Sequence, residues 1–365
     1  MEPLSVGLVG CGNISDRYLA ADDIFDAFDL VACADVDAER AEATAGEHGI
    51  EAMTPDALLG DESVDAVVNL TPPHVHAEVI TDALEAGMHV YTEKPFATTV
   101  ADAKAMVDLA ADRGLLVGSA PDTVLGAGLQ TARQVVDEGR IGEPVGATAH
   151  WTSPGHERWH PNPDLYYQEG GGPLFDMGPY YVTALVSLLG SATRVAGSVS
   201  RPHETRTIGS EPRKGEEIPV EVPTHEAGIV DFANGATANL LTSFDVQAST
   251  LPSPAFEIYG TEATLALPDP NHFEGPVRIR SDGDEEWETV GLTHKYTAGR
   301  GAGLADLAHA VRGDWDHRTS GTLASHVLEV MAAVRSSSTE SAFRTIDSDP
   351  GRPTPLPPSF PDVDV

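Results

Sequence analysis

The chain has 365 residues, enough for two domains of ordinary size. Its 22 Lys and Arg residues against 57 Asp and Glu residues give a formal net charge of −35, which argues against nucleic acid or an anionic membrane as a partner. Hydrophobic residues make up 41% of the chain, the share of an ordinary globular protein, and this argues against an acidic disordered chain.

Further features of the sequence indicate where the protein works, the state of its cysteines and the solvent it suits. No apolar run approaches the roughly 20 residues that cross a bilayer, and the N-terminus has no basic leader, so we expect a cytoplasmic protein. Cys11 and Cys33 both lie in apolar segments and are expected to be small buried residues, not a disulfide or a metal site. The acidic, lysine-poor composition resembles that of proteins from salt-loving organisms, in which salt screens repulsion between carboxylates.

The first 120 residues alternate short apolar runs with helical patterns. Strands are predicted at Ser5–Val9, Leu30–Ala34, Ala66–Leu70, His89–Thr92 and Leu115–Ser119. Helices are predicted between them, near 14–28, 37–48, 73–87 and 98–113. This alternation is typical of βαβ units, so residues 1–121 are predicted to form a doubly wound parallel sheet of the dinucleotide-binding (Rossmann) kind.

The first predicted strand ends in the motif G-x-G-x-x-S, formed by Gly10, Gly12 and Ser15. Gly10 permits a tight turn, and Gly12 lets the backbone approach a pyrophosphate. The second strand ends at Asp35, where a carboxylate suits the adenosine ribose hydroxyls and repels a 2′-phosphate. This favours NAD, although Arg40 leaves NADP open. The alternative is an ordinary glycine turn between a strand and a helix.

The next functional candidate is Lys94, in the segment Glu93-Lys94-Pro95. This segment directly follows a predicted strand, at the carboxyl edge of the sheet where ligands of doubly wound folds bind. The chain has only four lysines, so a lysine here invites a functional explanation. The alternative is a surface lysine beside a turn.

After residue 121 the pattern changes to that of an α+β domain, predicted over residues 122–345. A helix is expected at 123–137, a strand at 145–152, a Pro/Gly-rich loop at 153–172 and a long apolar helix at 173–189. Strands joined by tight turns follow up to residue 290, which indicates a mainly antiparallel sheet. Helices near 302–312 and 322–336 precede a Pro/Asp-rich segment, predicted to be an extended tail over 346–365.

The long apolar helix carries an acid, Asp176, and four residues later Tyr180, on the same helical face. An acid on an apolar face is costly unless it is paired, and Lys94 across a domain cleft would pair it. The alternatives are a structural Asp–Arg pair or a cap at the helix start. Tyr181 is the alternative functional tyrosine, but it lies to one side of this face and is expected to pack.

The loop before this helix contains His156, Trp159 and His160. Trp159 is expected to stack on a sugar ring, with the histidines binding hydroxyl groups. The four-residue spacing of the histidines also occurs in zinc helices, but the prolines and glycines oppose a helix here, so no metal is expected. The alternative is a structural loop. Asp122 is a further substrate candidate, with a helix N-cap as its alternative.

Together these motifs resemble the glucose–fructose oxidoreductase / inositol dehydrogenase / rhizopine-catabolism (Gfo/Idh/MocA) family over residues 4–340. The resemblance rests on the glycine loop at 10–14, the run from Thr71-Pro72 to His76, the Glu93-Lys94-Pro95 segment and the glycine run leading to Asp176 and Tyr180. It implies an N-terminal Rossmann domain and a C-terminal domain with an open, mostly antiparallel sheet.

The resemblance also implies functions for individual residues. NAD(P) would lie along Gly10, Gly12, Asn13, Ile14, Asp35, Thr71, Pro72, His76, Glu93 and Lys94. The Lys94–Pro95 bond is expected to be cis, Lys94 to be the catalytic lysine and Asp176 its partner. The open sheet would form a homodimer or homotetramer.

The chain departs from a common family pattern at Tyr180, where many relatives have a histidine that acts as general base. Other relatives have a tyrosine there that transfers the proton, and the resemblance implies the same role for Tyr180. A free tyrosine has a pKa near 10, poorly matched to neutral pH. A nearby Lys94 ammonium favours the phenolate, so Tyr180 is expected to transfer the proton while Lys94 polarises the substrate oxygen.

These observations predict an NAD(P)-dependent oxidoreductase. It would transfer a hydride between a secondary alcohol carbon of a sugar, polyol or glycoside and the nicotinamide. Two alternatives are a regulatory protein that senses NAD(P) without turnover and a glycosidase that works through transient oxidation.

Overall fold

The computed structural model describes residues 2–297, 299–313 and 315–361, which form two compact units. Unit 1 contains residues 1–126, 295–328 and 356–365, and unit 2 contains residues 127–294 and 329–355. The predicted boundary after residue 121 lies close to the first of these divisions. The sequence did not indicate that later segments return to unit 1, and residues 362–365 of the predicted tail lie outside the described residues.

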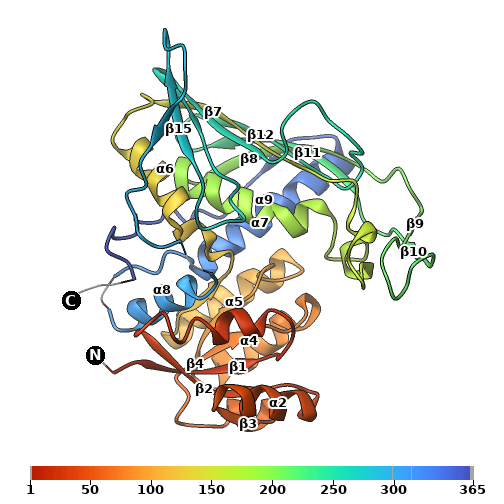
Figure 1. The fold of residues 1–365 in the computed structure, drawn as a ribbon, viewed down its shortest axis with the longest axis vertical. Helices are drawn as coiled ribbons and strands as arrows, with labels where there is room; N and C mark the ends of the chain where they lie inside the picture. Colours follow the sequence, from red (N-terminus) through yellow and green to blue (C-terminus); the bar gives the residue numbers. More distant parts are fainter. Residues whose placement is uncertain (1, 298, 314, 362–365) are drawn as a thin grey trace. The chain divides into compact units, whose positions relative to one another are not determined.

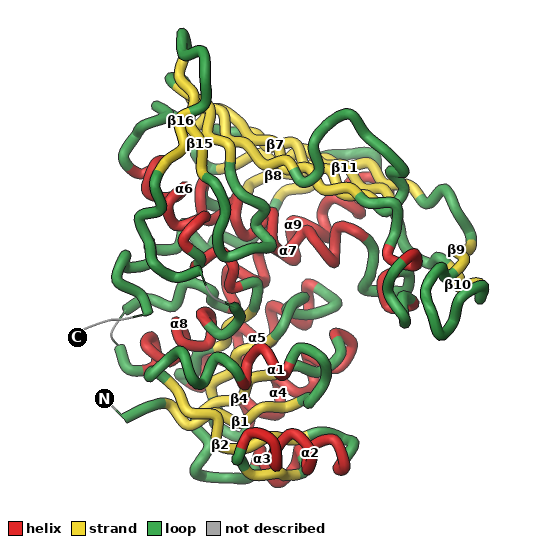
Figure 2. Tube along the Cα trace, in the orientation of Figure 1, coloured by secondary structure: helices red, strands yellow, loops and turns green. Residues whose placement is uncertain are grey.

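Unit 1 is built around a six-stranded parallel sheet with the strand order β3-β2-β1-β4-β5-β6 (Figures 1 and 2). Its strands are β1 (Leu4–Val9), β2 (Phe28–Ala34), β3 (Glu51–Met53), β4 (Ala66–Asn69), β5 (His89–Thr92) and β6 (Val117–Ser119). The order reverses between β1 and β4, which creates the crevice where ligands of such sheets bind. The predicted Rossmann sheet is confirmed, and the short edge strand β3 is an addition to it.

The helices of this unit pack on the sheet. They are α1 (Ser15–Leu19), α2 (Ala38–His48), α3 (Pro55–Leu59), α4 (His76–Glu85) and α5 (Val100–Arg113). Of these, α2, α3 and α5 begin at side-chain caps. The Thr99 hydroxyl accepts from the Asp102 amide at the start of α5, and Gly114 ends it in a left-handed conformation. Helix α1 is much shorter than predicted, because the Asp22 carboxylate accepts from the Leu30 amide and turns the chain back toward β2.

Segments from the C-terminal part of the chain complete unit 1. Helix α8 (Ala302–Val311) contacts β2, β5 and β6. The predicted tail carries Phe360, which is 1% exposed and packs on the rings of Phe25, Tyr296 and Trp315. The tail is therefore extended but anchored.

Unit 2 contains a nine-stranded sheet with the order β16-β15-β14-β13-β7-β12-β11-β8-β17. The central strands are β7 (Pro144–Thr152), β8 (Ala192–Ser200), β11 (His225–Phe232), β12 (Thr237–Ser243) and β13 (Ala255–Gly260). The outer strands are β14 (Ala263–Ala266), β15 (Val277–Ser281), β16 (Glu288–Val290) and β17 (Arg344–Thr345). Only β7 and β12 pair in parallel, which confirms the predicted mostly antiparallel sheet.

Helices cover one face of this sheet (Figure 2). They are α6 (Ala127–Asp137), α7 (Pro173–Leu189) and part of α9 (Gly321–Glu340). Helix α7 contacts β7, β11 and β12 and buries nearly every side chain, as its apolar sequence predicts. A separate hairpin, β9 (Thr205–Thr207) with β10 (Glu217–Pro219), lies beyond the end of the sheet.

The described residues show neither a membrane-spanning helix nor a cluster of metal ligands. None of the helices described in residues 2–297, 299–313 and 315–361 combines the length and apolarity needed to cross a membrane. The same residues contain no group of three or more His, Cys, Asp or Glu side chains arranged to hold a metal ion.

Candidate active site

The loop after β1 is formed by backbone conformation. Gly10 has a φ of +101°, and its amide donates to the Ala34 carbonyl oxygen at 2.8 Å. A Cβ at Gly10 would lie 2.9 Å from the Leu70 carbonyl oxygen. A Cβ at Gly12 would meet no atom within 4 Å outside its chain neighbours, so this side of the loop is open to a ligand backbone or phosphate. Asn13 is exposed, and Ile14 is half-buried.

Asp35 ties this loop to the end of β2. Its carboxylate accepts from the amides of Cys11 at 2.8 Å and Asp37 at 2.9 Å. The guanidinium of Arg40 lies 3.8 Å away. Asp35 therefore fixes the glycine loop as well as being the predicted ribose ligand. Cys11 and Cys33 are buried free thiols, as expected.

The loops after β4 and β5 are joined by His76. Its ring is fully buried, with Nε2 2.8 Å from the Thr71 carbonyl oxygen and Nδ1 2.8 Å from that of Pro95. Burial lowers the pKa of His76. The family resemblance placed His76 among the cofactor-binding residues, but this buried side chain instead connects the two loops, with Thr71 and Pro72 on one of them.

Glu93 and Lys94 directly follow β5. The Glu93 carboxylate is 9% exposed and accepts from the Tyr18 hydroxyl at 2.9 Å and from the Lys94 amide at 3.1 Å. Lys94 is half-buried, and the Lys94–Pro95 bond is cis, as the resemblance implies. Burial raises the pKa of Tyr18, so the hydroxyl remains a donor to Glu93. The backbone of Lys94 is thus held at the carboxyl edge of the sheet.

Asp122 has contacts that remove it from the predicted substrate site. It is fully buried, and its carboxylate accepts from the Gly301 amide at 2.9 Å, from the Gly303 amide at 3.3 Å and from Arg300 at 3.1 Å. Burial raises its pKa, and Arg300 opposes this. Asp122 therefore caps the start of α8, a helix far along the chain.

In unit 2, the start of α7 is held by an ion pair between the buried Glu226 and the half-buried Arg335. The Glu226 carboxylate accepts from the Leu174 amide at 2.9 Å and from Arg335 at 2.6 Å. Arg335 also donates to the Gly171 carbonyl oxygen, and its guanidinium lies over the Phe175 ring. Neither Glu226 nor Arg335 was identified from the sequence, because they come from β11 and α9. Together they fix the helical turn that carries Asp176.

Asp176 and Tyr180 lie one turn apart on α7, with Asp176 14% exposed at its side chain and Tyr180 5% exposed. Tyr181 is fully buried, and its hydroxyl donates to Asp269 at 3.3 Å, so it packs as expected. Lys94 belongs to unit 1 and Asp176 to unit 2. Their pairing across a cleft stays a prediction.

His156 differs from its predicted role as a substrate ligand. It is 7% exposed, and its Nε2 lies 2.9 Å from Oδ2 of Asp176. Trp159 is 61% exposed and remains available for a ligand. The Nδ1 atom of His160 accepts from the Asn162 amide at 3.1 Å. The structure thus brings together His156 and Asp176, two residues that were predicted to have separate roles.

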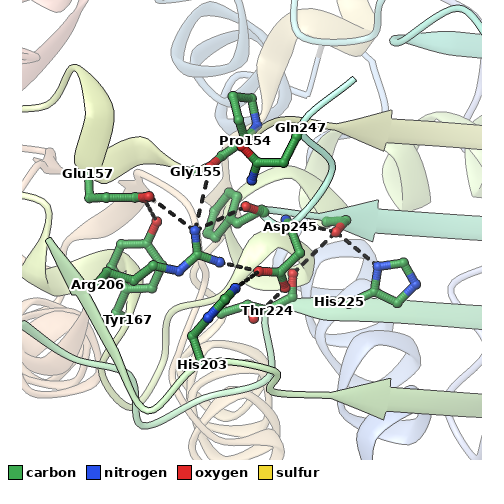
Figure 3. Close-up of polar contacts among 12 residues, drawn as sticks. Pro154, Gly155, Glu157, Tyr167, His203, Arg206, Thr224, His225, Asp245 and Gln247 are labelled. Carbon is green, nitrogen blue, oxygen red and sulfur yellow. Dashed lines mark hydrogen bonds and ion pairs between the residues drawn. The ribbon is translucent and has the colours of Figure 1, made fainter. Parts of the chain in front are cut away.

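A network of buried charges holds the loop of His156 (Figure 3). The Tyr167 hydroxyl accepts from the His156 amide at 3.1 Å and donates to Glu157. Arg206 lies between two carboxylates, 3.0 Å from Oε1 of Glu157 and in contact with Oδ1 of Asp245. Burial and Glu157 raise the pKa of Tyr167. Arg206 and Asp245 come from β9 and the segment after β12, so no local motif could have revealed them.

Comparison with known proteins identifies the family. Residues 4–120 match the model of an oxidoreductase family with an NAD-binding Rossmann fold, and residues 129–266 match a Gfo/Idh/MocA C-terminal domain. The chain belongs to the Gfo/Idh/MocA family. It is therefore an oxidoreductase with an NAD-binding Rossmann domain. In this domain, the open space beside Gly12 would suit the backbone or phosphate of a dinucleotide.

Individual Gfo/Idh/MocA relatives extend this comparison. The chain is 35% identical over 209 residues to dTDP-3,4-didehydro-2,6-dideoxy-alpha-D-glucose 3-reductase of Streptomyces violaceoruber, a match that covers 56% of this chain and 60% of that enzyme. It is 33% identical to the enzyme of the same name from Saccharopolyspora spinosa, over 77% of this chain and 81% of the other. A solved levoglucosan dehydrogenase in complex with NADH and L-sorbose has the same fold, with a TM-score of 0.81 at 22% identity over 95% of this chain and 100% of that one.

Proposed function

We propose that the protein is an NAD-dependent dehydrogenase or reductase that acts on a secondary alcohol carbon of a sugar, polyol or glycoside. Lys94, Asp176 and Tyr180 are its catalytic residues. The observation that carries the proposal is Asp176, held by His156 and one turn from Tyr180 on α7, in a chain whose other unit holds the Lys94 backbone at the carboxyl edge of a parallel sheet. The curated relatives, which are named as enzymes of sugar chemistry, support the substrate class.

The residues of unit 1 prepare the reaction by holding the cofactor. Gly10 permits the tight turn and Gly12 leaves room for the pyrophosphate. Asp35 selects the unphosphorylated ribose because its carboxylate repels a 2′-phosphate. The bound nicotinamide supplies or accepts the hydride. Lys94 polarises the oxygen of the reacting carbon, because its ammonium stabilises the negative charge that develops there.

The residues of unit 2 bind and orient the sugar. Asp176 accepts a hydrogen bond from a substrate hydroxyl, and Tyr180 transfers the proton. Trp159 offers an exposed ring face on which a pyranose ring can stack, and His160 lies next to it with ring centroids 5.4 Å apart. Asp122 takes no part, because the α8 amides and Arg300 occupy its carboxylate.

Two properties of the surface complete the proposal. The second face of the unit 2 sheet carries an apolar groove of about 620 Å³, in which Ile229 is 43% and Leu251 65% exposed. We propose that this face pairs two copies of the chain, as a homodimer or within a homotetramer. Light scattering would show a monomer if this is incorrect.

The net charge of −35 supports a cytoplasm that contains molar salt as the protein's environment. We therefore expect the melting temperature of the protein to rise with the KCl concentration.

The test is an assay of NADH absorbance in molar KCl, with NAD⁺ or NADP⁺ and a panel of sugars, polyols and glycosides. We expect one substrate class to produce NADH. The control is Lys94→Ala, which should reduce turnover by about 10³-fold while NAD⁺ affinity in calorimetry changes little.

Other outcomes would redirect the proposal. Tight NAD⁺ binding with no turnover across the panel would favour the regulatory protein. Release of an aglycone without net NADH would favour hydrolysis through transient oxidation. Normal turnover by Lys94→Ala would show that the catalytic residues are misassigned.

A further inference from the structure

The imidazole of His156 lies within hydrogen-bonding distance of the carboxylate of Asp176. The Nε2–Oδ2 distance is 2.9 Å, and the side chain of His156 is 9% exposed against 14% for Asp176. The carboxylate is therefore the more accessible member of the pair. Because Nδ1 of His156 is buried and Nε2 is engaged by Asp176, we expect a substrate hydroxyl to meet the carboxylate and not the imidazole.

The two nitrogens of this ring differ in a way that assigns its proton. Nδ1 is buried and has no hydrogen-bond partner among the residues that the structure describes. A proton on Nδ1 would be a buried donor without an acceptor, whereas a proton on Nε2 donates to Asp176. The neutral ring therefore carries its proton on Nε2, and this donor holds Oδ2 of the carboxylate.

The surroundings of His156 prevent the ring from turning away. Its centroid lies 4.4 Å from the ring of Tyr166, 4.6 Å from Phe244, 5.1 Å from Trp159 and 5.9 Å from Trp151. Three of these four contacts are edge-to-face, a favourable geometry for packed rings.

The backbone of His156 is fixed as firmly as its ring. Its amide donates to the Tyr167 hydroxyl, which belongs to the network of Glu157, Arg206 and Asp245 (Figure 3). The enclosing rings and this network hold the imidazole in one orientation, which a residue needs in order to orient another group.

We propose that His156 is a positioning residue for the reaction: through Nε2–H it fixes the orientation of the catalytic Asp176 carboxylate, so that the substrate hydroxyl meets an acceptor of set direction. This inference rests on the proposed function, because it takes Asp176 as the group that contacts the substrate. It replaces the expected role of His156 as a direct ligand of the sugar.

The kinetic test compares two substitutions in the full-length protein. His156→Phe fills the aromatic enclosure but removes the donor, and misorientation of Asp176 should lower kcat by about 100-fold. His156→Gln keeps an N–H donor at the end of its side chain and should recover about tenfold of this loss. The Kd for NAD⁺ should not change in either variant. A loss confined to KM would instead indicate direct substrate binding and overturn the proposal.

A matched control is present in the same unit. His272 also faces a carboxylate, Asp269, but at 3.9 Å and with a side chain that is 68% exposed. His272→Gln should leave kcat and KM at their wild-type values. Thermal unfolding of each variant shows whether the fold is intact. If either His156→Phe or His156→Gln is unstable, the other can still be compared with the wild-type protein.

A spectroscopic test detects the hydrogen bond without turnover. In ¹⁵N-labelled protein, the Nε2 proton of His156 should give a low-field imidazole signal that disappears in His156→Gln and shifts in Asp176→Asn. His272→Gln should leave this signal in place. Absence of the signal, or a proton found on Nδ1, would overturn the inference.

The two proposals fail in different ways. If the wild-type protein turns over a sugar and His156→Phe is equally fast, the role of His156 is refuted while the proposed function stands. If the wild-type protein turns over nothing in the panel, the proposed function is refuted, and the role of His156 in that reaction with it.

Discussion

The loop after β1 and the loop after β7 both lie in the candidate site and both precede a helix, but their shapes depend on different interactions. The first takes its shape from backbone, with Gly10 at positive φ and amides that bind Ala34 and Asp35. The second takes its shape from side chains, because Glu157 and Tyr167 of the loop itself are buried with Arg206 of β9. A backbone-built site needs a few residues close in sequence, whereas a side-chain-built site draws on distant ones.

The difference matters for how each loop tolerates change. A glycine loop fails when a Cβ has no space, which is a local steric effect. A charge network fails when one partner is removed and the others remain buried without compensation. The two loops should therefore respond to different substitutions, with effects of different size.

The largest effect is expected in the charge network. Arg206→Leu leaves the carboxylates of Glu157 and Asp245 without their shared cation, which should reduce the free energy of unfolding by about 3–5 kcal/mol. Urea titration followed by tryptophan fluorescence measures this. The control is Arg194→Leu, which removes a largely exposed pair with Asp231 and should cost under about 1 kcal/mol. Equal losses in both variants would mean that the network does not stabilise the loop.

A smaller effect is expected in the glycine loop. Gly10→Ala places a Cβ 2.9 Å from the Leu70 backbone at a φ of +101°, and the resulting shift should weaken NAD⁺ binding by roughly ten- to a hundredfold, or about 1–3 kcal/mol. Calorimetry with NAD⁺ measures it. Gly49 also has a positive φ, +72°, but a Cβ there meets no atom within 4 Å, so Gly49→Ala should change stability and not affinity. Unchanged affinity in Gly10→Ala would place the cofactor elsewhere.

The smallest effect is expected at Asp35. Asp35→Asn removes the charge that repels a 2′-phosphate, so the preference for NAD⁺ over NADP⁺ should fall by about tenfold. The ratio of the two Kd values measures this preference. Asp37→Asn is the matched control, because Asp37 is 49% exposed and caps α2 through an oxygen that asparagine retains. If both variants shift the ratio equally, general charge and not the position of Asp35 sets the preference.

The contrast between a loop shaped by local backbone and a loop shaped by distant side chains also explains which features could be predicted from the sequence. The parallel sheet, its glycine loop and the segment at Lys94 follow local patterns of apolar runs, glycines and spacing, and the structure contains them. The edge strand β3 and helix α3 were not predicted, because each is too short to show a hydrophobic periodicity in the sequence. Helix α1 was predicted too long because the contact of Asp22 with Leu30 is not visible in a helical pattern.

The candidate site was predictable only where its residues lie within one motif. Asp176 and Tyr180 follow from helical spacing, and Tyr181 packs as that spacing indicates. The contact of His156 with Asp176 spans 20 residues of irregular loop, so no periodic rule connects them. Arg206, Glu226 and Asp245 lie on separate strands and turns, and their roles depend on the sheet register that brings them beside the loop or α7. Asp122 and His76 look like site residues in sequence, yet they hold backbone amides and carbonyls.

The discontinuous make-up of unit 1 has a consequence for how the chain matures during synthesis. The parallel strands are synthesised first. The aromatic cluster around Phe25 can form only after Tyr296, Trp315 and Phe360 have also been synthesised. Asp122 likewise cannot accept its hydrogen bonds from the Gly301 and Gly303 amides until those residues have been synthesised. These long separations carry a high loop-closure cost and favour slow folding. The segment 127–294 of unit 2 is therefore complete on the nascent chain before the N-terminal sheet can close its own core.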